Sequence, residues 1–118
     1  MGREMESFGD VIREERIHKE KSLRQLAREI EVTPSYLSDI ENDRRVPAEI
    51  IILKISKVLG IDFNVLMGLA GRVGAEAKEY SRRQPMAIQL FRRIAEKDLD
   101  EGKLKQLLED IEKNKKEK

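Results

Sequence analysis

Two helix-start signals stand so close together in this sequence that the helices they begin have almost no loop between them. The first is Ser22, whose hydroxyl can accept a hydrogen bond from a backbone N–H of the first helical turn. The second is Thr33 followed by Pro34, an N-cap residue and a proline at the first helical position, where a missing N–H costs nothing. The apolar period of the first helix runs on to Ile30, so only two residues are left to turn the chain.

The first of these two helices is amphipathic. Its apolar residues recur at i, i+3, i+4 and i+7, the period of one helix face; they are Leu23, Leu26, Ala27 and Ile30. A small residue, Ala27, lies where the second helix would touch the first, and Glu31 and Val32 form the turn. Two short helices joined in this way have the sequence form of a helix-turn-helix.

The residues in and beyond this stretch resemble the Cro/CI-repressor (XRE-like) type of helix-turn-helix DNA-binding domain. The resemblance is carried by Ala27, Val32, Thr33, Leu37, Ser38, Ile40, Glu41, Asn42 and Pro47. It covers roughly the first seventy residues and implies a compact five-helix domain of a kind that usually binds DNA as a dimer. One position departs from the family, which usually has a left-handed Gly where Glu31 stands. A non-Gly residue there costs on the order of 1 kcal/mol, so we expect a strained or slightly reshaped turn.

The composition favours an all-α fold and argues against several functions. Charged residues make up 40% of the chain and aromatic residues 4%, which suits a helical protein with a modest aliphatic core. The sequence has no Cys, no metal-ligand spacing, no Gly-rich phosphate loop and a single histidine, His18, so we expect no cofactor, no metal and no enzymatic activity. No apolar run is long enough to span a membrane, and no signal-peptide pattern opens the chain. We therefore expect a cytoplasmic protein with no membrane partner.

A helix that begins near Phe8 precedes the motif, and it predicts an ion pair. Its apolar stripe, continued by four residues from Ile12, reaches Arg16. A basic residue on a buried stripe needs a partner, and Glu41 lies on the same side of its helix as the inward-facing Leu37. We expect Arg16 and Glu41 to pair, as the family resemblance also implies; the alternative is that both side chains reach solvent.

Two more helices complete the predicted first domain. The sequence predicts one from about Ala48 to Leu59, ended by Gly60, and one capped by Asp62. The expected core residues of these two helices are Ile51, Ile55, Val58, Leu59, Phe63, Leu66, Met67 and Ala70. The glycines that follow favour an irregular backbone, and we place the boundary between the two domains near Gly71. Residues 1–70 are the predicted DNA-binding domain, and residues 71–118 are a helical C-terminal extension.

The extension is expected to contain a short helix over residues 75–83 with Tyr80 inward, a helix that begins at Pro85, and a last helix capped by Asp100. The last two carry apolar stripes, which are Ala87, Leu90, Phe91, Ile94 and Ala95, and then Leu104, Leu107, Leu108 and Ile111. Helices of this length cannot bury such stripes alone. We expect homodimerisation through them in preference to folding back on the first domain. Residues 114–118 are expected to form a frayed, solvated tail.

The outward face of the second motif helix supplies the candidates for reading bases. With Leu37 and Ile40 inward, this reading face consists of Ser35, Tyr36, Ser38 and Asp39. Ser35 can donate or accept, and Asp39 accepts only, so its natural partner is the N4 amino group of cytosine. Tyr36 can donate its hydroxyl to a phosphate or lay its ring on a thymine methyl group. The alternative for each is a solvated helix residue.

Phosphate contacts are expected from residues at the two ends of the motif, which are Ser22, Arg24, Asn42, Arg44 and Arg45. The net charge of the predicted DNA-binding domain does not favour these phosphate contacts. Residues 1–70 contain 11 Lys and Arg against 13 Asp and Glu, a net charge of −2, whereas residues 71–118 contain 13 against 10. Because DNA-binding domains usually carry a net positive charge, binding would have to rest on local arginines.

The function favoured by these patterns is a sequence-specific regulator that binds double-stranded DNA as a dimer and acts as a repressor at a palindromic operator. The alternative is an antitoxin-like or adaptor module whose main partner is another protein. The net negative charge of the first domain, with Asp39 and Asp43 on its reading face, would suit a basic protein. A third interpretation combines both, with a protein regulator bound by the C-terminal helices.

Overall fold

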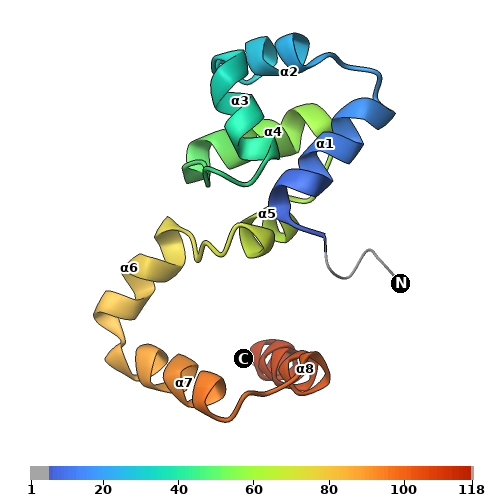
Figure 1. Cartoon of the computed structure of the whole chain (residues 1–118). Helices are drawn as coiled ribbons and strands as arrows, with labels where there is room; N and C mark the ends of the chain where they lie inside the picture. Colours follow the sequence, from blue (N-terminus) through green and yellow to red (C-terminus); the bar gives the residue numbers. More distant parts are fainter. Residues whose placement is uncertain (1–5, 118) are drawn as a thin grey trace. The chain divides into compact units, whose positions relative to one another are not determined.

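The computed structural model describes the backbone of residues 6–117 and the side chains of residues 6–114. Within these residues the secondary structure is entirely α-helical (Figure 1). The helices are α1 (Phe8–His18), α2 (Leu23–Glu29), α3 (Pro34–Glu41), α4 (Glu49–Leu59), α5 (Phe63–Leu69), α6 (Ala75–Arg83), α7 (Pro85–Glu96) and α8 (Glu101–Glu117). The all-α class is confirmed, with five helices in the first domain. The chain divides into two units, Met1–Gly74 and Ala75–Lys118, whereas the sequence placed the boundary near Gly71.

The first unit has a continuous hydrophobic core. Helix α3 packs against both α1 and α2, and α4 packs against α1 and α5. The buried apolar residues are Phe8, Ile12, Leu26, Ala27, Ile30, Leu37, Ile40, Ile52, Ile55, Leu59, Leu66 and Met67. Helix α4 departs from the prediction, because Ile52 is fully buried and Ile51 and Val58 are only partly buried. Three consecutive isoleucines all suit an apolar stripe, so the packing of the helix decides which one lies innermost.

The predicted helix starts are present as hydrogen-bonded caps. The side chain of Ser22 accepts from the backbone N–H of Gln25 at 3.0 Å, and that of Thr33 accepts from the N–H of Tyr36 at 3.0 Å. The sequence analysis missed Ser7, whose side chain accepts from the Asp10 N–H at 3.1 Å in a capping box. These caps satisfy N–H groups that a helix leaves unpaired at its first turn.

The turn between α2 and α3 has the left-handed backbone that the sequence led us to expect at Glu31, with φ at 65°. The Glu31 N–H donates to the carbonyl of Arg28 at 3.1 Å, and the Val32 N–H donates to that of Ala27 at 2.9 Å. This pair of bonds satisfies the last carbonyls of α2 within two residues. The Glu31 carboxylate lies 2.5 Å from the Lys54 ammonium on α4, which ties the turn to the core of the unit.

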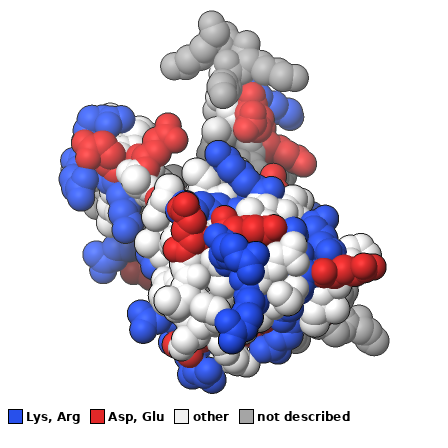
Figure 2. Space-filling model, turned by 90° about the horizontal axis from the view of Figure 1, so that it is seen from above, with Lys and Arg blue, Asp and Glu red and all other residues white. Residues whose placement is uncertain are grey.

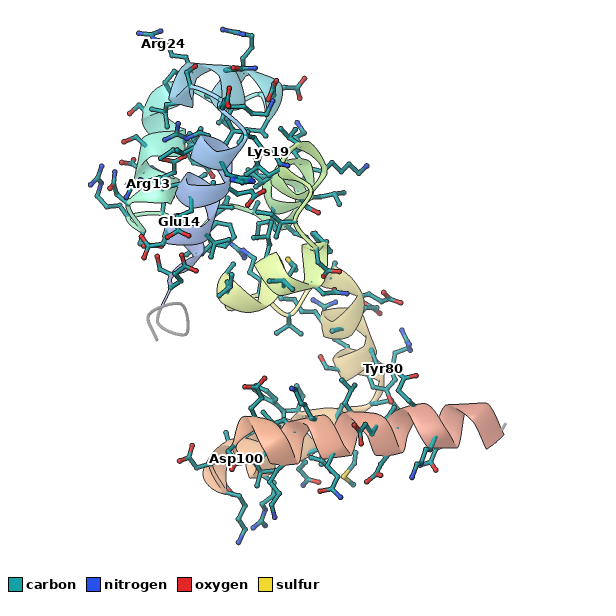
Figure 3. All side chains as sticks on the ribbon, turned by 90° about the vertical axis from the view of Figure 1, so that its right-hand side faces the viewer. Arg13, Glu14, Lys19, Arg24, Tyr80 and Asp100 are labelled. Atoms are coloured by element: carbon teal, nitrogen blue, oxygen red, sulfur yellow. The ribbon has the colours of Figure 1, made fainter. Side chains whose placement is uncertain are left out.

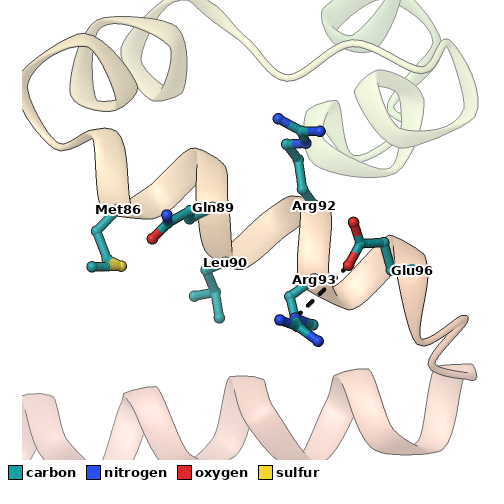
Figure 4. Close-up of a pocket in the computed structure, with 6 residues that line it drawn as sticks. All are labelled: Met86, Gln89, Leu90, Arg92, Arg93 and Glu96. Atoms are coloured by element: carbon teal, nitrogen blue, oxygen red, sulfur yellow. Dashed lines mark ion pairs between the residues drawn. The ribbon is translucent and has the colours of Figure 1, made fainter.

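In the second unit most large apolar side chains are exposed. Helices α6 and α7 contain no buried residue, and the prediction that Tyr80 lies inward is wrong, because it is 50% exposed. Its ring lies 5.8 Å from the guanidinium of Arg83 instead. On α7, Met86 and Leu90 line an open hollow together with Gln89, Arg92, Arg93 and Glu96 (Figure 4).

Helix α8 begins as predicted, since the Asp100 carboxylate accepts from the Lys103 N–H at 3.0 Å. It continues to Glu117, so the predicted frayed tail is helical as far as that residue, and Lys118 lies outside the described residues. The good helix formers at the end of the chain account for the extra turn. None of the described helices is long and apolar enough to cross a membrane.

Candidate nucleic-acid interface

Helix α3 is held by its apolar side, and this exposes the face that the sequence singled out. Leu37 and Ile40 are fully buried, which fixes the rotation of the helix about its axis. Among the residues of the reading face, Ser35 is exposed, while Tyr36, Ser38 and Asp39 are half-buried. Tyr36 also packs against the core, so its ring is supported from one side while its outer side remains accessible.

An ion pair anchors the end of α3 to α1. Arg16 Nε lies 2.7 Å from Glu41 Oε2, and Arg16 Nη2 lies 3.1 Å from Glu41 Oε1, which is the two-pronged geometry that a guanidinium forms with a carboxylate. Arg16 Nη1 also donates to the Lys21 carbonyl at 2.9 Å. The Glu41 side chain is only 3% exposed. The pair expected from the sequence is therefore present and largely buried, and it fixes α3 against α1.

Arg13, which the sequence analysis did not single out, joins this network. Its Nε lies 3.6 Å from Glu41 Oε1, and its Nη2 donates to Asn42 Oδ1 at 2.7 Å. Asn42 in turn donates from Nδ2 to the Ser38 carbonyl at 2.9 Å. Both polar groups of the Asn42 amide are thus engaged within the protein. Arg13 lies one turn before Arg16 on the same side of α1, and that spacing is the signal that could have identified it.

The two loop arginines fold back onto α3. Arg44 Nε donates to Asp39 Oδ1 at 3.1 Å, and the Arg45 guanidinium carbon lies 5.1 Å from the centre of the Tyr36 ring, within the range of a cation–π contact. In the sequence these four residues were considered one by one. The structure brings them together as two pairs, each of which joins a residue of the reading face to an arginine.

The backbone at the end of α3 explains how Arg44 reaches Asp39. The Arg44 N–H donates to the Asp39 carbonyl at 2.8 Å, and the Asp43 N–H donates to the Ile40 carbonyl at 3.1 Å. This is the Schellman arrangement, with Asp43 in the left-handed conformation at a φ of 59°. It returns the chain toward the last turn of the helix, so the side chains of Asp39 and Arg44 lie next to each other.

Asp43 has a different role from the one expected for it on the reading face. Its carboxylate accepts from Ser7 Oγ at 2.5 Å and from the Gly9 N–H at 2.9 Å, so it faces the start of α1. Gly9 permits this close approach, because a Cβ there would lie 2.5 Å from the Glu41 carbonyl oxygen. The placement of Asp43 was not predictable from its own segment, since its partners are 34 and 36 residues away in the sequence.

The loop that carries the arginines is also held from its far side. Arg72, which follows α5, donates from Nε to the Pro47 carbonyl at 2.7 Å and from Nη2 to the Val46 carbonyl at 3.2 Å. These bonds satisfy two carbonyls of a segment without regular structure. The sequence analysis missed Arg72, which stands in a glycine-containing stretch assigned to the boundary between domains.

The other phosphate candidates lie at the start of α2. Ser22 is exposed and caps the helix, and Arg24 is exposed and points away from the helix (Figure 3). Basic and acidic side chains are interspersed on the face of the molecule seen in Figure 2, consistent with the near-zero net charge.

The Lys54 ammonium lowers the pKa of the Glu31 carboxyl below its ordinary value. The larger cause is the hydrogen bond between the two groups, and the smaller is the positive charge of the ammonium. Within the described residues, no group of three or more His, Asp or Glu side chains could hold a metal ion.

Comparison with known proteins finds one family model and several solved structures to which this chain is similar. Residues 12–66 match the family model described as helix-turn-helix. The crystal structure of SinR, the master regulator for biofilm formation, in complex with DNA is 34% identical; the match covers 51% of this chain and 97% of that chain, with a TM-score of 0.48. The complex of the SinR and SinI proteins is 25% identical, covering 94% of this chain and 99% of that chain, with a TM-score of 0.49.

The clp gene regulator ClgR from Corynebacterium glutamicum is 24% identical, covering 74% of this chain and 85% of that chain, with a TM-score of 0.49. No similar protein was found among curated protein sequences. The family model runs from Ile12 in α1 to Leu66 in α5, and the match at 34% identity covers nearly all of the SinR chain in the DNA complex. Through this segment the chain belongs to the helix-turn-helix family.

Proposed function

We propose that this protein binds double-stranded DNA at specific sequences, with α3 in the major groove, and represses transcription from a palindromic operator as a homodimer. The observation that carries the proposal is the outward face of α3. Leu37 and Ile40 are buried in the core and hold one side of the helix. Asp39 and Tyr36 lie on the accessible side, and each has an arginine beside it. In this motif the second helix enters the major groove and its first residues contact base edges.

The proposed contacts divide into two groups. Base contacts are assigned to Ser35, Tyr36, Ser38 and Asp39, and phosphate contacts to Ser22, Arg24, Asn42, Arg44 and Arg45. Of the second group, Arg24, Arg44 and Arg45 are exposed cations. Arg24 can approach the DNA backbone directly, whereas Arg44 and Arg45 would first have to leave Asp39 and Tyr36. Asn42 would first have to exchange its bonds to Arg13 and Ser38, which makes it the weakest of the phosphate candidates.

Dimerisation is proposed to use the apolar stripes of α7 and α8. Leu90 is 59% exposed, Phe91 67%, Leu108 59% and Ile111 60%, an unusual amount of large apolar surface for a small unit. A second copy would cover it and would present two copies of α3 about one helical turn of DNA apart. Sedimentation equilibrium should find a dimer, and Phe91→Ser combined with Leu108→Ser should shift the protein to monomer. A wild-type protein that stays monomeric at about 100 μM would refute this part of the proposal.

Selection from random duplex DNA at moderate salt tests the central claim. We expect enrichment of an inverted repeat whose half-site centres are about ten or eleven base pairs apart. A transcription assay with that site overlapping a promoter should then show reduced transcript, because a bound dimer excludes polymerase. Absence of enrichment at any salt concentration would refute sequence-specific binding.

A protein partner is the second candidate, and the same exposed surface of the second unit favours it. If the selection fails, binding of a neighbouring gene product to α7 and α8 becomes the better account. The two functions separate in one experiment, because DNA binding by arginines weakens steeply with salt, whereas association through an apolar stripe does not.

A further inference from the structure

The pairing of Asp39 with Arg44 combines two residues with opposite attractions to DNA. A carboxylate repels phosphates and accepts hydrogen bonds only, so on duplex DNA it is suited to the cytosine N4 amino group. A guanidinium binds phosphates at any sequence. In the structure the Arg44 Nε donates to Asp39 Oδ1 at 3.1 Å, and the Arg44 side chain is 63% exposed.

The pair is held in place by the backbone but is not buried. The Schellman bond from the Arg44 N–H to the Asp39 carbonyl fixes the two α-carbons near each other. The side chains are 63% and 32% exposed, and ion pairs with this exposure are weak and screened by salt. Such a pair can open when a better partner arrives for either member.

We infer that Asp39 is a specificity-determining residue that acts partly through Arg44, which it restrains from binding phosphate at arbitrary sequences. This inference rests on the proposed DNA-binding function. At the correct site a base donor satisfies Asp39, and Arg44 is released to the adjacent backbone. At an incorrect site, release of Arg44 leaves the carboxylate in the groove without a donor, which is costly. Discrimination between sequences therefore includes a cost at wrong sites as well as a contact at the right one.

The test compares wild type, Asp39→Asn, Arg44→Ala and the double variant for binding to the selected operator and to mixed-sequence duplex over a range of salt. Asparagine matches the shape of aspartate and removes the charge. We expect Asp39→Asn to bind mixed-sequence duplex ~5–10-fold more tightly near 0.1 M salt and to steepen the salt dependence by about one unit of slope, the contribution of one added phosphate contact. The ratio of operator to mixed-sequence affinity should fall ~tenfold or more.

The double variant separates release of Arg44 from the simple loss of a negative charge. If Arg44 causes the gain, Arg44→Ala should abolish most of it in the Asp39→Asn background and have a smaller effect on mixed-sequence binding in wild type. Glu79→Gln is the matched control, since it removes one carboxylate from an exposed pair with Arg82 on α6. Its affinity for mixed-sequence duplex should stay within about twofold of wild type.

Two outcomes would overturn the inference. One is equal affinity of Asp39→Asn and wild type for mixed-sequence duplex; the other is an equal effect of Arg44→Ala in both backgrounds, which means that the residues act independently. Circular dichroism and thermal melting of each variant verify folding, and the three substituted side chains (Asp39, Arg44 and Glu79) are at least partly exposed. If the wild-type protein binds no DNA, the proposed function itself is refuted. If it selects an operator but the effects of Asp39→Asn and Arg44→Ala are independent, only the inference about Asp39 and Arg44 is refuted.

Discussion

Leu37 and Leu108 occupy the same kind of position in two different environments. Each lies on the apolar stripe of an amphipathic helix, yet Leu37 is completely buried, whereas Leu108 is 59% exposed. The first unit surrounds its stripes with five short helices that cross one another. In the second unit, α6 and α7 contain no buried residue, and the described part of α8 is exposed along its length.

This difference shows that an apolar stripe predicts a helix without predicting what covers it. In the first unit the cover is supplied by neighbouring segments of the same chain. In the second unit the described residues leave most of each stripe exposed, so the proposed dimer would draw on the free energy of burying them. The two units should therefore respond differently to substitution. In order of decreasing effect, two experiments compare the units, and two more test close contacts within the first unit.

The largest effect is expected at the buried ion pair. Glu41→Ala removes the partner of Arg16, which is only 14% exposed, and leaves an uncompensated charge in the first unit. We expect a loss of about 3–5 kcal/mol in the free energy of unfolding, measured by urea denaturation. Glu79→Ala, which breaks an exposed pair in the second unit, should cost less than about 1 kcal/mol. Similar costs for the two substitutions would contradict the contrast drawn here.

The two leucines provide the most direct comparison. Leu37→Ala should destabilise the first unit by about 2–5 kcal/mol, because it opens a cavity in a packed core. Leu108→Ala should leave the unfolding transition of the first unit unchanged and instead weaken self-association, measured by sedimentation at several protein concentrations. If Leu108→Ala lowered the stability of the first unit as much as Leu37→Ala, the two stripes would not differ as described.

A smaller effect is expected where α1 approaches the end of α3. Gly9→Ala places a Cβ 2.5 Å from the Glu41 carbonyl oxygen and 2.6 Å from that of Ile40. Neither backbone atom can move without shifting α3, so we expect a cost of about 1–3 kcal/mol. Gly68→Ala on α5 is the matched control, since a Cβ there has no other atom within 4 Å. It should stabilise the protein by about 0.5–1 kcal/mol, and a stabilising Gly9→Ala would show that the approach is less tight.

The smallest effect concerns pH and the turn between α2 and α3. Because the Lys54 ammonium lowers the pKa of Glu31 in the folded state, the pair stabilises the fold fully above the ordinary pKa and loses its contribution as the pH falls through the lowered value. The melting temperature of wild type should exceed that of Glu31→Gln at pH 7, and the gap should close on acidification. Lys54→Gln should remove the same pH-dependent gap. A gap that widened at low pH would reverse the sign of the argument.

Helix starts were predictable from the sequence because the signals are local. Ser22, Thr33 and Asp62 each cap the helix that follows them, and Glu31 has the left-handed backbone anticipated from the family. The rotation of α4 was less predictable. All three isoleucines at 50–52 suit an apolar stripe, and only packing against α1 and α5 selects Ile52.

The candidate site was predictable as a set of positions but not as a set of pairs. The sequence placed Asp39, Tyr36, Arg44 and Arg45 in the same short stretch, and it linked Arg16 to Glu41 across 25 residues. It did not foresee that each loop arginine would face a residue of α3, because that depends on the left-handed turn at Asp43. Arg72 was missed because it lies in a segment without regular structure, where no helical period indicates its carbonyl partners 25 and 26 residues away. Arg13 was missed although it lies one turn before Arg16 on α1, because its polar partner Asn42 is not on an apolar stripe. Which of these residues contact DNA stays a prediction.

The two bonds from Arg72 to the carbonyls of Val46 and Pro47 have a practical consequence for dissecting this protein. A fragment ending at Ala70 would retain all five helices of the first unit and lose the side chain that secures the loop after α3. A fragment ending at Gly74, where the first unit ends, would retain it. The difference of four residues should appear as a less protected backbone around Arg45 in hydrogen exchange of the shorter fragment, even where both fragments have the same helical content.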